Sequence, residues 1–309
     1  MLDETAAGVF TIAVTPFLPD GALDEGSVDR MTDFYVEKGA TGLTLLGIMG
    51  EAGKLTHAES VTVVRRVTAR TALPVVVGVS APGFAAMQAL SGDAMAAGAA
   101  GVMVAPPASL RNDDQILAYF QGVAETLGPI PWVLQDFPLV TSVTIPPRVI
   151  LKIVETCPTC VMLKHEDWPG LEKIAALRRA SDDGARRISI LCGNGGQFLP
   201  EEMERGADGA MTGFAFPEMM AEVVRQFREG QRARMHEVFA AYLPLIRYES
   251  QPGLGLAVRK HVLWQRGAIA HPTLRRPGGA LTPTAVAEVE AIIARQERRL
   301  AEIGAQTGA

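Results

Sequence analysis

Eight short apolar segments, rich in β-branched residues, alternate with segments of helical periodicity along the chain. Continuous apolar strands are typical of a parallel sheet that is covered on both faces, because both faces of each strand are then buried. Eight such units in succession predict closure into an α/β fold of the (β/α)8 TIM-barrel type. The predicted strands are residues 9–14, 42–47, 75–80, 101–106, 131–136, 161–164, 188–193 and 209–213.

A weak internal repeat favours the barrel over a doubly wound open sheet, which is the alternative for this alternation of elements. The segments "KGATGLTLL", "AGAAGVMVA" and "RGADGAMTG" each carry Gly-Ala-x-Gly between a predicted helix and a predicted strand. The first glycine suits a left-handed helix cap, and the second permits a tight approach to the sheet. We expect a catalytic barrel at residues 1–228 and a C-terminal helical extension at 229–309, with helical periodicity near 217–243, 253–266 and 284–300.

The net charge of the chain limits the kinds of partner that it can bind. A net charge of −5 argues against a nucleic-acid or anionic-membrane surface, which needs clustered Lys and Arg in excess. The acidic start "MLDETAAG" is unlike a signal peptide, and no apolar run approaches the ~18 residues of a membrane span. We therefore expect a soluble, cytoplasmic protein with a small-molecule partner.

The chain has three cysteines in 309 residues, which are too few for a fold that depends on disulfide bonds. Cys157 and Cys160 form a C-x-x-C pair, but a structural zinc site needs about four ligands and Cys192 is the one cysteine left. The favoured interpretation is a helix end that turns into a strand, with no metal site.

Lys164 ends the sixth predicted strand and precedes "HED". Active sites of such barrels lie at the carboxyl ends of the strands. Burial of a lysine is costly unless the ammonium is paired or neutral, and desolvation is also what converts an amine into a nucleophile. Lys164 is therefore either a nucleophile or a structural lysine that reaches solvent or pairs with a carboxylate such as Glu166 or Glu51.

Other predicted strand ends carry polar groups. Gln135 and Asp136 end the fifth strand, and Thr212 lies near the end of the eighth. After the second strand, "LGIMGEAGKL" carries two glycines that leave backbone amides free to hold a carboxylate. Gly193 and Asn194 belong to a second glycine-rich loop, "LCGNGG", after the seventh strand. We expect these groups to meet Lys164 at one face of the barrel.

Five segments spread along nearly the whole chain carry recognisable motifs: "GVFTIAVTPFLPDGALD", "LLGIMGEAGKLTHAE", "VAPP", "VMLK" and "RKHVLWQRGAIAHPTLRRP". Together they resemble the dihydrodipicolinate synthase and N-acetylneuraminate lyase superfamily. "GVFTIAVTPFLPDGALD" is similar to the first strand and loop of that family, "LLGIMGEAGKLTHAE" to its Gly-x-x-Gly-Glu loop, "VAPP" to its fourth strand end and "VMLK" to its Schiff-base lysine strand. "RKHVLWQRGAIAHPTLRRP" resembles its closing helix and Arg-x-Pro tail. The resemblance implies a class I aldolase or dehydratase on a TIM barrel, without a metal or separate cofactor, assembled as a homotetramer.

By that resemblance, Lys164 forms an imine with the 2-keto group of a pyruvate-like acid, and the imine acts as an electron sink. The middle positions of the carboxylate-binding loop, usually hydroxyl residues, are Ile48 and Met49 here, so only their backbone amides can serve. The implied substrate-binding residues are Gly47, Ile48, Met49, Gly50, Glu51, Gly193, Asn194 and Thr212.

The fifth strand departs from the family pattern. Where most members have Tyr-Asn-x-Pro, whose phenol relays protons, this chain has Gln135, Asp136, Phe137 and Pro138. The tyrosine after the fourth-strand prolines is also absent, as is the arginine that the family's synthases use for a second carboxylate. The departures argue against lysine-biosynthetic synthase activity.

One branch, the 2-keto-3-deoxy-sugar-acid dehydratases and especially those for 2-keto-3-deoxyarabonate, is similar in carrying Gln-Asp-x-Pro, Lys-x-Glu-x-x-Pro-Gly and Met-Thr-Gly. We therefore predict a dehydratase in which Lys164 is the nucleophile, Glu166 and Asp136 move protons, and Gln135 orients substrate or water. Two alternatives stay open. One is a pyruvate-releasing aldolase, and the other is a 2-keto-acid-binding protein without catalysis.

Overall fold

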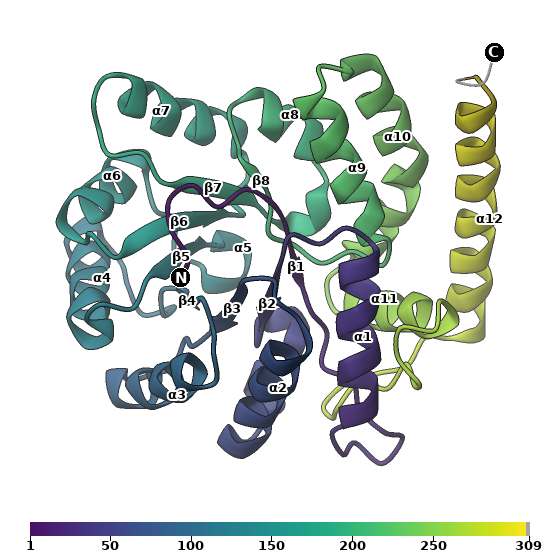
Figure 1. Ribbon diagram of the computed structural model, residues 1–309, viewed down its shortest axis with the longest axis horizontal. Coiled ribbons are helices and arrows are strands. Elements are labelled where there is room, and N and C mark those ends of the chain that lie inside the picture. Colours follow the sequence, from purple (N-terminus) through teal and green to yellow (C-terminus); the bar gives the residue numbers. More distant parts are fainter. Residues whose placement is uncertain (307–309) are drawn as a thin grey trace.

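Eight parallel strands close into a barrel in the computed structural model, which describes residues 1–306 (Figure 1). Each strand pairs with its neighbours in sequence, and β1 pairs with β8, which confirms the predicted barrel over the open sheet. The strands are β1 (Gly8–Ile12), β2 (Gly42–Leu45), β3 (Val75–Gly78), β4 (Gly101–Val104), β5 (Trp132–Asp136), β6 (Cys160–His165), β7 (Ser189–Cys192) and β8 (Gly209–Ala210).

The strands separate two apolar cores. Phe10, Met103, Met162 and Leu191 belong to a small cluster inside the barrel, and the larger cluster lies between the strands and the helices. Both faces of each strand are buried, which explains the continuous apolar runs of the sequence. Because side chains alternate along a strand, Lys164 faces the barrel interior as Met162 does.

Helices follow each strand and surround the barrel. A capping box, in which Thr56 and Glu59 satisfy each other's backbone amides, begins α2. The helices of this part are α1 (Glu25–Glu37), α2 (His57–Arg70), α3 (Phe84–Ala96), α4 (Asp113–Leu127), α5 (Pro138–Thr141), α6 (Pro147–Thr156), α7 (Leu171–Asp182), α8 (Leu199–Glu204) and α9 (Pro217–Arg228). Single 3-10 turns, η1 (Ile48–Gly50), η2 (Ala52–Lys54) and η3 (Asn194–Gly196), shape the loops after β2 and β7.

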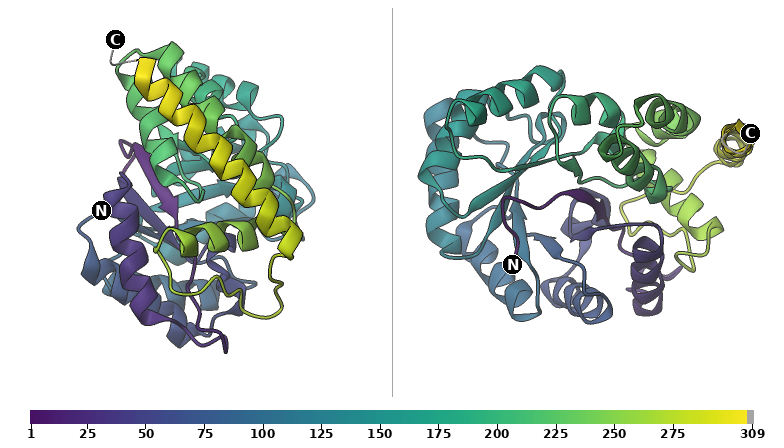
Figure 2. Two further views of the ribbon diagram at one scale, coloured as in Figure 1. Left: turned by 90° about the vertical axis from the view of Figure 1, so that its right-hand side faces the viewer. Right: turned by 45° about the horizontal axis from the view of Figure 1, so that its top comes forward.

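The C-terminal part consists of α10 (Arg232–Glu249), α11 (Gly255–Gln265) and α12 (Pro283–Gln306). The helical segment expected near 217–243 is two helices, because the chain turns at Gly230, whose φ of +74° favours glycine. Figure 2 shows α12 along the outside of the molecule, where it packs on α10. None of the helices in residues 1–306 is long and apolar enough to span a membrane.

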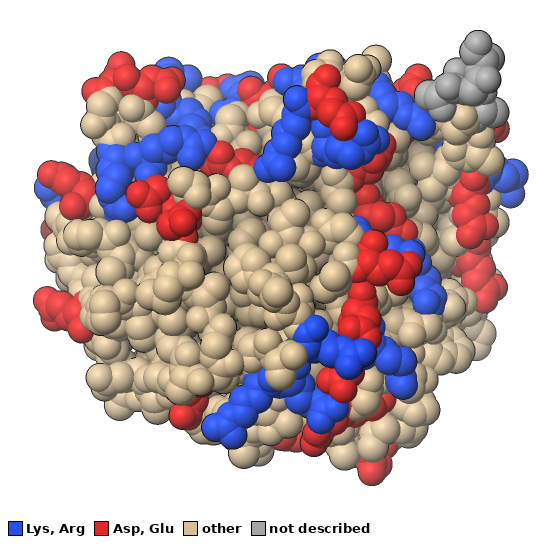
Figure 3. All heavy atoms as spheres, in the orientation of Figure 1, with Lys and Arg blue, Asp and Glu red and all other residues tan. Residues whose placement is uncertain are grey.

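Charged side chains of both signs are interspersed on the face shown in Figure 3, and the middle of that face is uncharged. Cys157, Cys160 and Cys192 are buried, free thiols. Cys157 and Cys160 lie in the apolar core, and this burial raises the pKa of the Cys160 thiol to about 12.

Candidate active site

A cavity of about 710 Å³ opens at the carboxyl end of the barrel. We call it the barrel-mouth cavity. Its wall combines strand ends, the loops after β2, β5, β7 and β8, and the C-terminal part of the chain. Among its lining residues are Ile12, Ile48, Met49, Lys54, Gln135, Phe137, Lys164, Glu166, Trp168, Asn194, Thr212, Gly213, Glu249, Arg259 and Leu274.

Lys164, Glu166 and Gln135 form one polar cluster in this cavity. Oε2 of Glu166 lies 2.9 Å from Nζ of Lys164 and accepts a hydrogen bond of 2.8 Å from Nε2 of Gln135. The side chains of Lys164 and Glu166 are each 6% exposed. The strand register pairs Gln135 with Lys164, so both side chains emerge on the interior face of adjacent strands. An amine, a carboxylate and an amide thus meet where a bound keto acid would react.

Glu166 faces the same way as Lys164 because the sheet pairing continues past the end of β6. The amide of Glu166 donates to the carbonyl of Asp136 at 2.9 Å, and the amide of Gly193 donates to the carbonyl of His165 at 2.8 Å. A Cβ atom on Gly193 would lie 2.2 Å from Cγ of Glu166. Nδ2 of Asn194 donates to the carbonyl of Glu166 at 2.9 Å. Gly193 and Asn194 therefore support Glu166, although only Asn194 also lines the cavity.

Asp136, an expected proton carrier, has its carboxylate outside the barrel-mouth cavity. It is 0% exposed and bonds to Nζ of Lys173 at 2.7 Å, on the face that α7 covers. Burial raises the pKa of Asp136 to about 6 against the opposing effect of Lys173. His165 faces the same layer, and burial lowers its pKa to about 4. The structure does not bring Asp136 to Lys164, because Asp136 follows the inward-facing Gln135 and neighbouring residues of a strand face opposite sides.

The predicted carboxylate-binding loop is a 3-10 turn. Within it, the amide of Gly50 donates to the carbonyl of Gly47 at 3.0 Å, and that of Glu51 donates to the carbonyl of Ile48 at 3.0 Å. Ile48 and Met49 line the cavity. In the part of the chain that the structure describes, the amide nitrogens of Ile48 and Met49 have no hydrogen-bond partner. Two free donors are therefore available beside the cavity.

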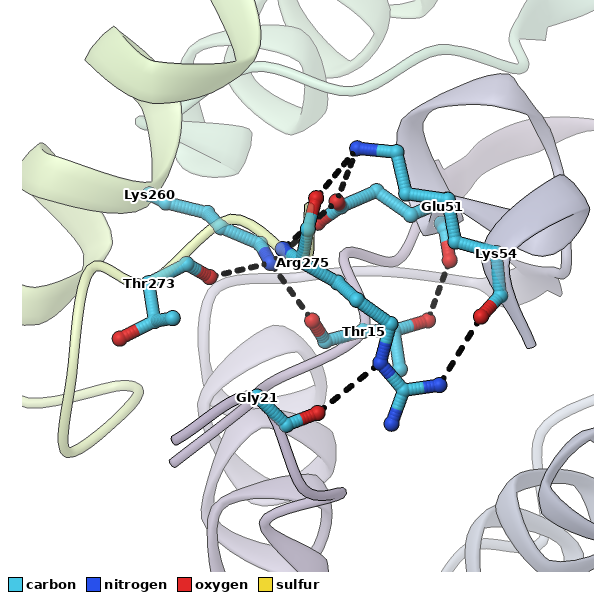
Figure 4. A network of polar contacts seen from close by, with 8 residues as sticks. Thr15, Gly21, Glu51, Lys54, Lys260, Thr273 and Arg275 are labelled. Carbon is cyan, nitrogen blue, oxygen red and sulfur yellow. Dashed lines mark hydrogen bonds and ion pairs between the residues drawn. The ribbon is translucent and has the colours of Figure 1, made fainter. Parts of the chain in front are cut away.

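Glu51 does not line the cavity. Its carboxylate lies in a buried polar network (Figure 4). Its carboxylate bonds to the ammonium groups of Lys260 and Lys54 and to the amide of Arg275. Sequence reasoning did not single out Lys54, Lys260 or Arg275. The sequence feature that could have pointed to Lys260 and Arg275 is the resemblance of their segment to the closing helix and tail of the family.

A second buried ion pair lines the cavity. Nε and Nη2 of Arg259 each lie 3.0 Å from Oε2 of Glu249, and the amide of Ala215 donates to Oε1 of Glu249. A Cβ atom on Gly213 would lie 2.3 Å from Nη1 of Arg259, so a larger residue at that position would displace the guanidinium. Thr212, the neighbouring residue, accepts a bond from the amide of Gly195 at 2.8 Å. Thr212 lines the cavity. No feature of the sequence pointed to the Glu249–Arg259 ion pair.

Residues 5–296 match the model of the dihydrodipicolinate synthetase family. The chain belongs to this family. As a member of the dihydrodipicolinate synthetase family, it is a lyase of the class I, Schiff-base type.

Relatives within the family carry two different names. An L-2-keto-3-deoxyarabonate dehydratase from Azospirillum brasilense is 29% identical, over 93% of this chain and 94% of that protein. A 4-hydroxy-tetrahydrodipicolinate synthase from Sorangium cellulosum is 31% identical, over 91% of this chain and 94% of that protein. A crystal structure of a dihydrodipicolinate synthase from Rhodopseudomonas palustris is 56% identical, has a TM-score of 0.94, and covers 95% of this chain and 99% of that one.

Proposed function

We propose that the protein is a dehydratase that forms a Schiff base between Lys164 and a 2-keto-3-deoxy sugar acid, of the 2-keto-3-deoxyarabonate type. The observation that carries the proposal is the contact of Glu166 with both Lys164 and Gln135 inside the cavity. This member lacks the phenol of most of its family, and Glu166 supplies a titratable group in the same cluster. The dehydratase from Azospirillum brasilense supports the same reaction class.

In the proposed mechanism, the amine of Lys164 adds to C2 of the substrate and water leaves, which gives a protonated imine. Glu166 accepts a proton from C3, and the electron pair flows into the imine to give an enamine. The enamine expels the C4 hydroxyl, which leaves as water after Glu166 returns the proton. Hydrolysis of the resulting conjugated imine releases the product and the amine. Gln135 donates to Glu166 throughout and orients its carboxylate.

The polar groups of the cavity support a substrate with one carboxylate and several hydroxyls. The free amides of Ile48 and Met49 would bind the carboxylate. Arg259 is already neutralised by Glu249 and so is poorly suited to a second carboxylate. Hydroxyl-binding groups are available from Asn194 and Thr212.

A pyruvate-releasing aldolase of the same family is the second candidate, and the outer cavity favours it. Phe137, Leu139, Val140 and Trp168 give that part of the wall a large apolar surface, and the last three are more than a third exposed. An apolar aldehyde fits such a wall better than a polyhydroxylated tail does. The imine on Lys164 would serve this reaction as well: the C4 hydroxyl loses its proton, the C3–C4 bond breaks, and its electron pair flows into the imine to give an aldehyde and an enamine. Protonation of the enamine at C3 and hydrolysis then release pyruvate.

The deciding experiment incubates the protein with a panel of 2-keto-3-deoxypentonates and 2-keto-3-deoxyhexonates and identifies the products by mass spectrometry. The proposal expects loss of one water molecule without pyruvate. Pyruvate release, read with coupled lactate dehydrogenase, would establish the aldolase instead. A protein that binds 2-keto acids and converts none of them would be the non-catalytic alternative.

We also propose that the enzyme works in the cytoplasm as a homotetramer. The support is the resemblance to its family. Light scattering after size-exclusion chromatography gives the mass in solution. A mass near four times 32.9 kDa is expected, and a mass of one chain would refute the tetramer.

A further inference from the structure

The carboxylate of Glu51 accepts three hydrogen bonds in a buried polar network (Figure 4). Oε1 lies 2.5 Å from Nζ of Lys260, and Oε2 accepts from Nζ of Lys54 at 2.8 Å and from the amide of Arg275 at 3.0 Å. The side chain of Glu51 is 1% exposed. Two of the three donors come from the C-terminal part of the chain, more than two hundred positions away. Glu51 therefore fixes the end of η1 to α11 and the segment after it.

Lys260 has no donor to spare. Its ammonium also donates to the carbonyl of Thr15 at 2.7 Å and to that of Thr273 at 2.8 Å, and it lies 4.6 Å from the ring centre of Phe17. An ammonium group has three protons, so its contacts to Glu51 and the two carbonyls use all of them. The group is 0% exposed and is held at one position by three separate segments. Such a group fixes Glu51 rather than reacting with a ligand.

The loop is held at a second point next to Glu51. Oγ1 of Thr15 donates to the carbonyl of Gly50 at 2.5 Å. Glu51 has a φ of +53°, a left-handed conformation that non-glycine residues rarely adopt unless their surroundings hold them there. The two anchored residues directly follow Ile48 and Met49, whose amides have no partner in residues 1–306. The network thus constrains the orientation of two free donors at the cavity wall.

Arg275 extends the same network to the cavity mouth. Its guanidinium donates to the carbonyls of Gly21 and Lys54 at 2.9 Å each and to Glu59 at 2.6 Å and 2.8 Å. Leu274, which precedes it, lines the cavity. The C-terminal part therefore forms cavity wall and loop support together.

We propose that Thr15, Glu51 and Lys260 are positioning residues that hold the amides of Ile48 and Met49 where they bind the carboxylate of the 2-keto acid. This inference rests on the proposed function of the site. The side chains of Ile48 and Met49 cannot donate to an anion, so carboxylate binding depends on the backbone geometry of one short turn. A small rotation of the two amides weakens that binding, while attack of Lys164 on the ketone is unaffected.

The test compares pyruvate with methyl pyruvate, which has the same ketone and no negative charge. Borohydride traps the imine, and the concentration of each ketone at half-maximal trapping is measured by intact-protein mass spectrometry. In the variants Glu51→Gln and Thr15→Val, the value for pyruvate is expected to rise about 10-fold, and the value for methyl pyruvate is expected to stay unchanged. Thr15→Val keeps the shape of the side chain, so it tests the loop even where Glu51→Gln does not fold.

Glu218→Gln is the matched control. Glu218 pairs with Arg266 at the end of α11, so the substitution breaks an ion pair on the same helix as Lys260 without contact to the loop. Both half-maximal values should stay at the wild-type level. A parallel weakening for both ketones, or wild-type values in both loop variants, would overturn the inference alone. Failure of the wild-type protein to form any adduct would overturn the proposed function and the inference together.

Discussion

Oε2 of Glu166 lies 2.9 Å from Nζ of Lys164, and both side chains are almost completely buried in the barrel-mouth cavity. A buried ion pair of this kind stabilises little by itself, because the desolvation of two charges offsets their attraction. Its position beside a substrate-sized cavity gives it a chemical use. The carboxylate can hold a proton near the carbon atoms that an imine on Lys164 would activate.

Replacement of Glu166 tests the proposed proton carrier. Glu166→Gln keeps the size of the side chain and removes its capacity to titrate, so kcat should fall by about 10²- to 10⁴-fold. Trapping of pyruvate on Lys164 by borohydride should persist, because the variant keeps the amine that attacks the ketone and solvent can supply the proton for loss of water. Steady-state rates on the preferred 2-keto-3-deoxy acid measure the effect. Glu172→Gln, on the exposed face of α7, is the control, and a Glu166→Gln rate equal to that of the control would reject the assignment.

Gly193 tests whether the position of Glu166 matters as much as its charge. The methyl group of Gly193→Ala would lie 2.2 Å from Cγ of Glu166, so the side chain of Glu166 must shift from its position beside Lys164. We expect kcat to fall about 10²-fold, since displacements near 1 Å have such effects. In Gly92→Ala, the added methyl group on α3 meets nothing within 4 Å. Equal rates for the two alanine variants would show that Glu166 tolerates displacement.

The contact between Gly213 and the guanidinium of Arg259 gives a prediction about substrate selection. In Gly213→Ala, the new methyl group would displace Nη1 of Arg259, which lies 2.3 Å from the Cβ position, and disturb the wall next to Thr212. KM for the sugar acid should rise about 10-fold, because contacts to the hydroxylated tail shift. Half-maximal trapping of pyruvate, which has no tail, should change little. Equal changes for the two ligands would contradict a role of this wall in tail recognition.

Much of the fold was predictable because local patterns specify it. Each of the eight predicted strands is present, since a buried parallel strand is apolar on both faces and the sequence shows that directly. The break between α9 and α10 at Gly230 was missed, because helical periodicity alone does not register one left-handed residue.

The site was predictable in part. Lys164 and Glu166 followed from strand position and resemblance, and the alternation of side chains along β5 could have assigned Asp136 to the outer face. The contacts of Glu51 with Lys260 and of Gly213 with Arg259 join residues far apart in the sequence. No local pattern encodes such pairs, so only the three-dimensional structure reveals them.

Glu202 gives a prediction of pH-dependent stability. Burial raises the pKa of this carboxyl, on α8, to about 8. The folded protein therefore binds more protons than the unfolded chain between about pH 4.5 and 8, so the stabilising contribution of Glu202 is present below this range and is lost across it. In this window, ionisation of Glu202 lowers the free energy of unfolding of the wild-type protein by up to ~1.4 kcal/mol per pH unit, and Glu202→Gln should remove this decline.

Thermal unfolding from pH 5 to 8.5 checks this prediction. The melting temperature of Glu202→Gln relative to wild type should rise with pH. Glu237→Gln, whose side chain is 45% exposed on α10, should follow the wild-type profile. A constant difference between Glu202→Gln and wild type at all pH values would mean that Glu202 does not titrate in this range.

The central claim is that the amine of Lys164 carries the reaction. The most direct measurement is borohydride trapping with a 2-keto acid, followed by peptide mapping, on wild type and Lys164→Ala together with their turnover rates. The account predicts a single adduct on Lys164 in the wild-type protein, and neither adduct nor measurable turnover in the variant. Retained turnover in Lys164→Ala, or an adduct on another residue, would contradict it.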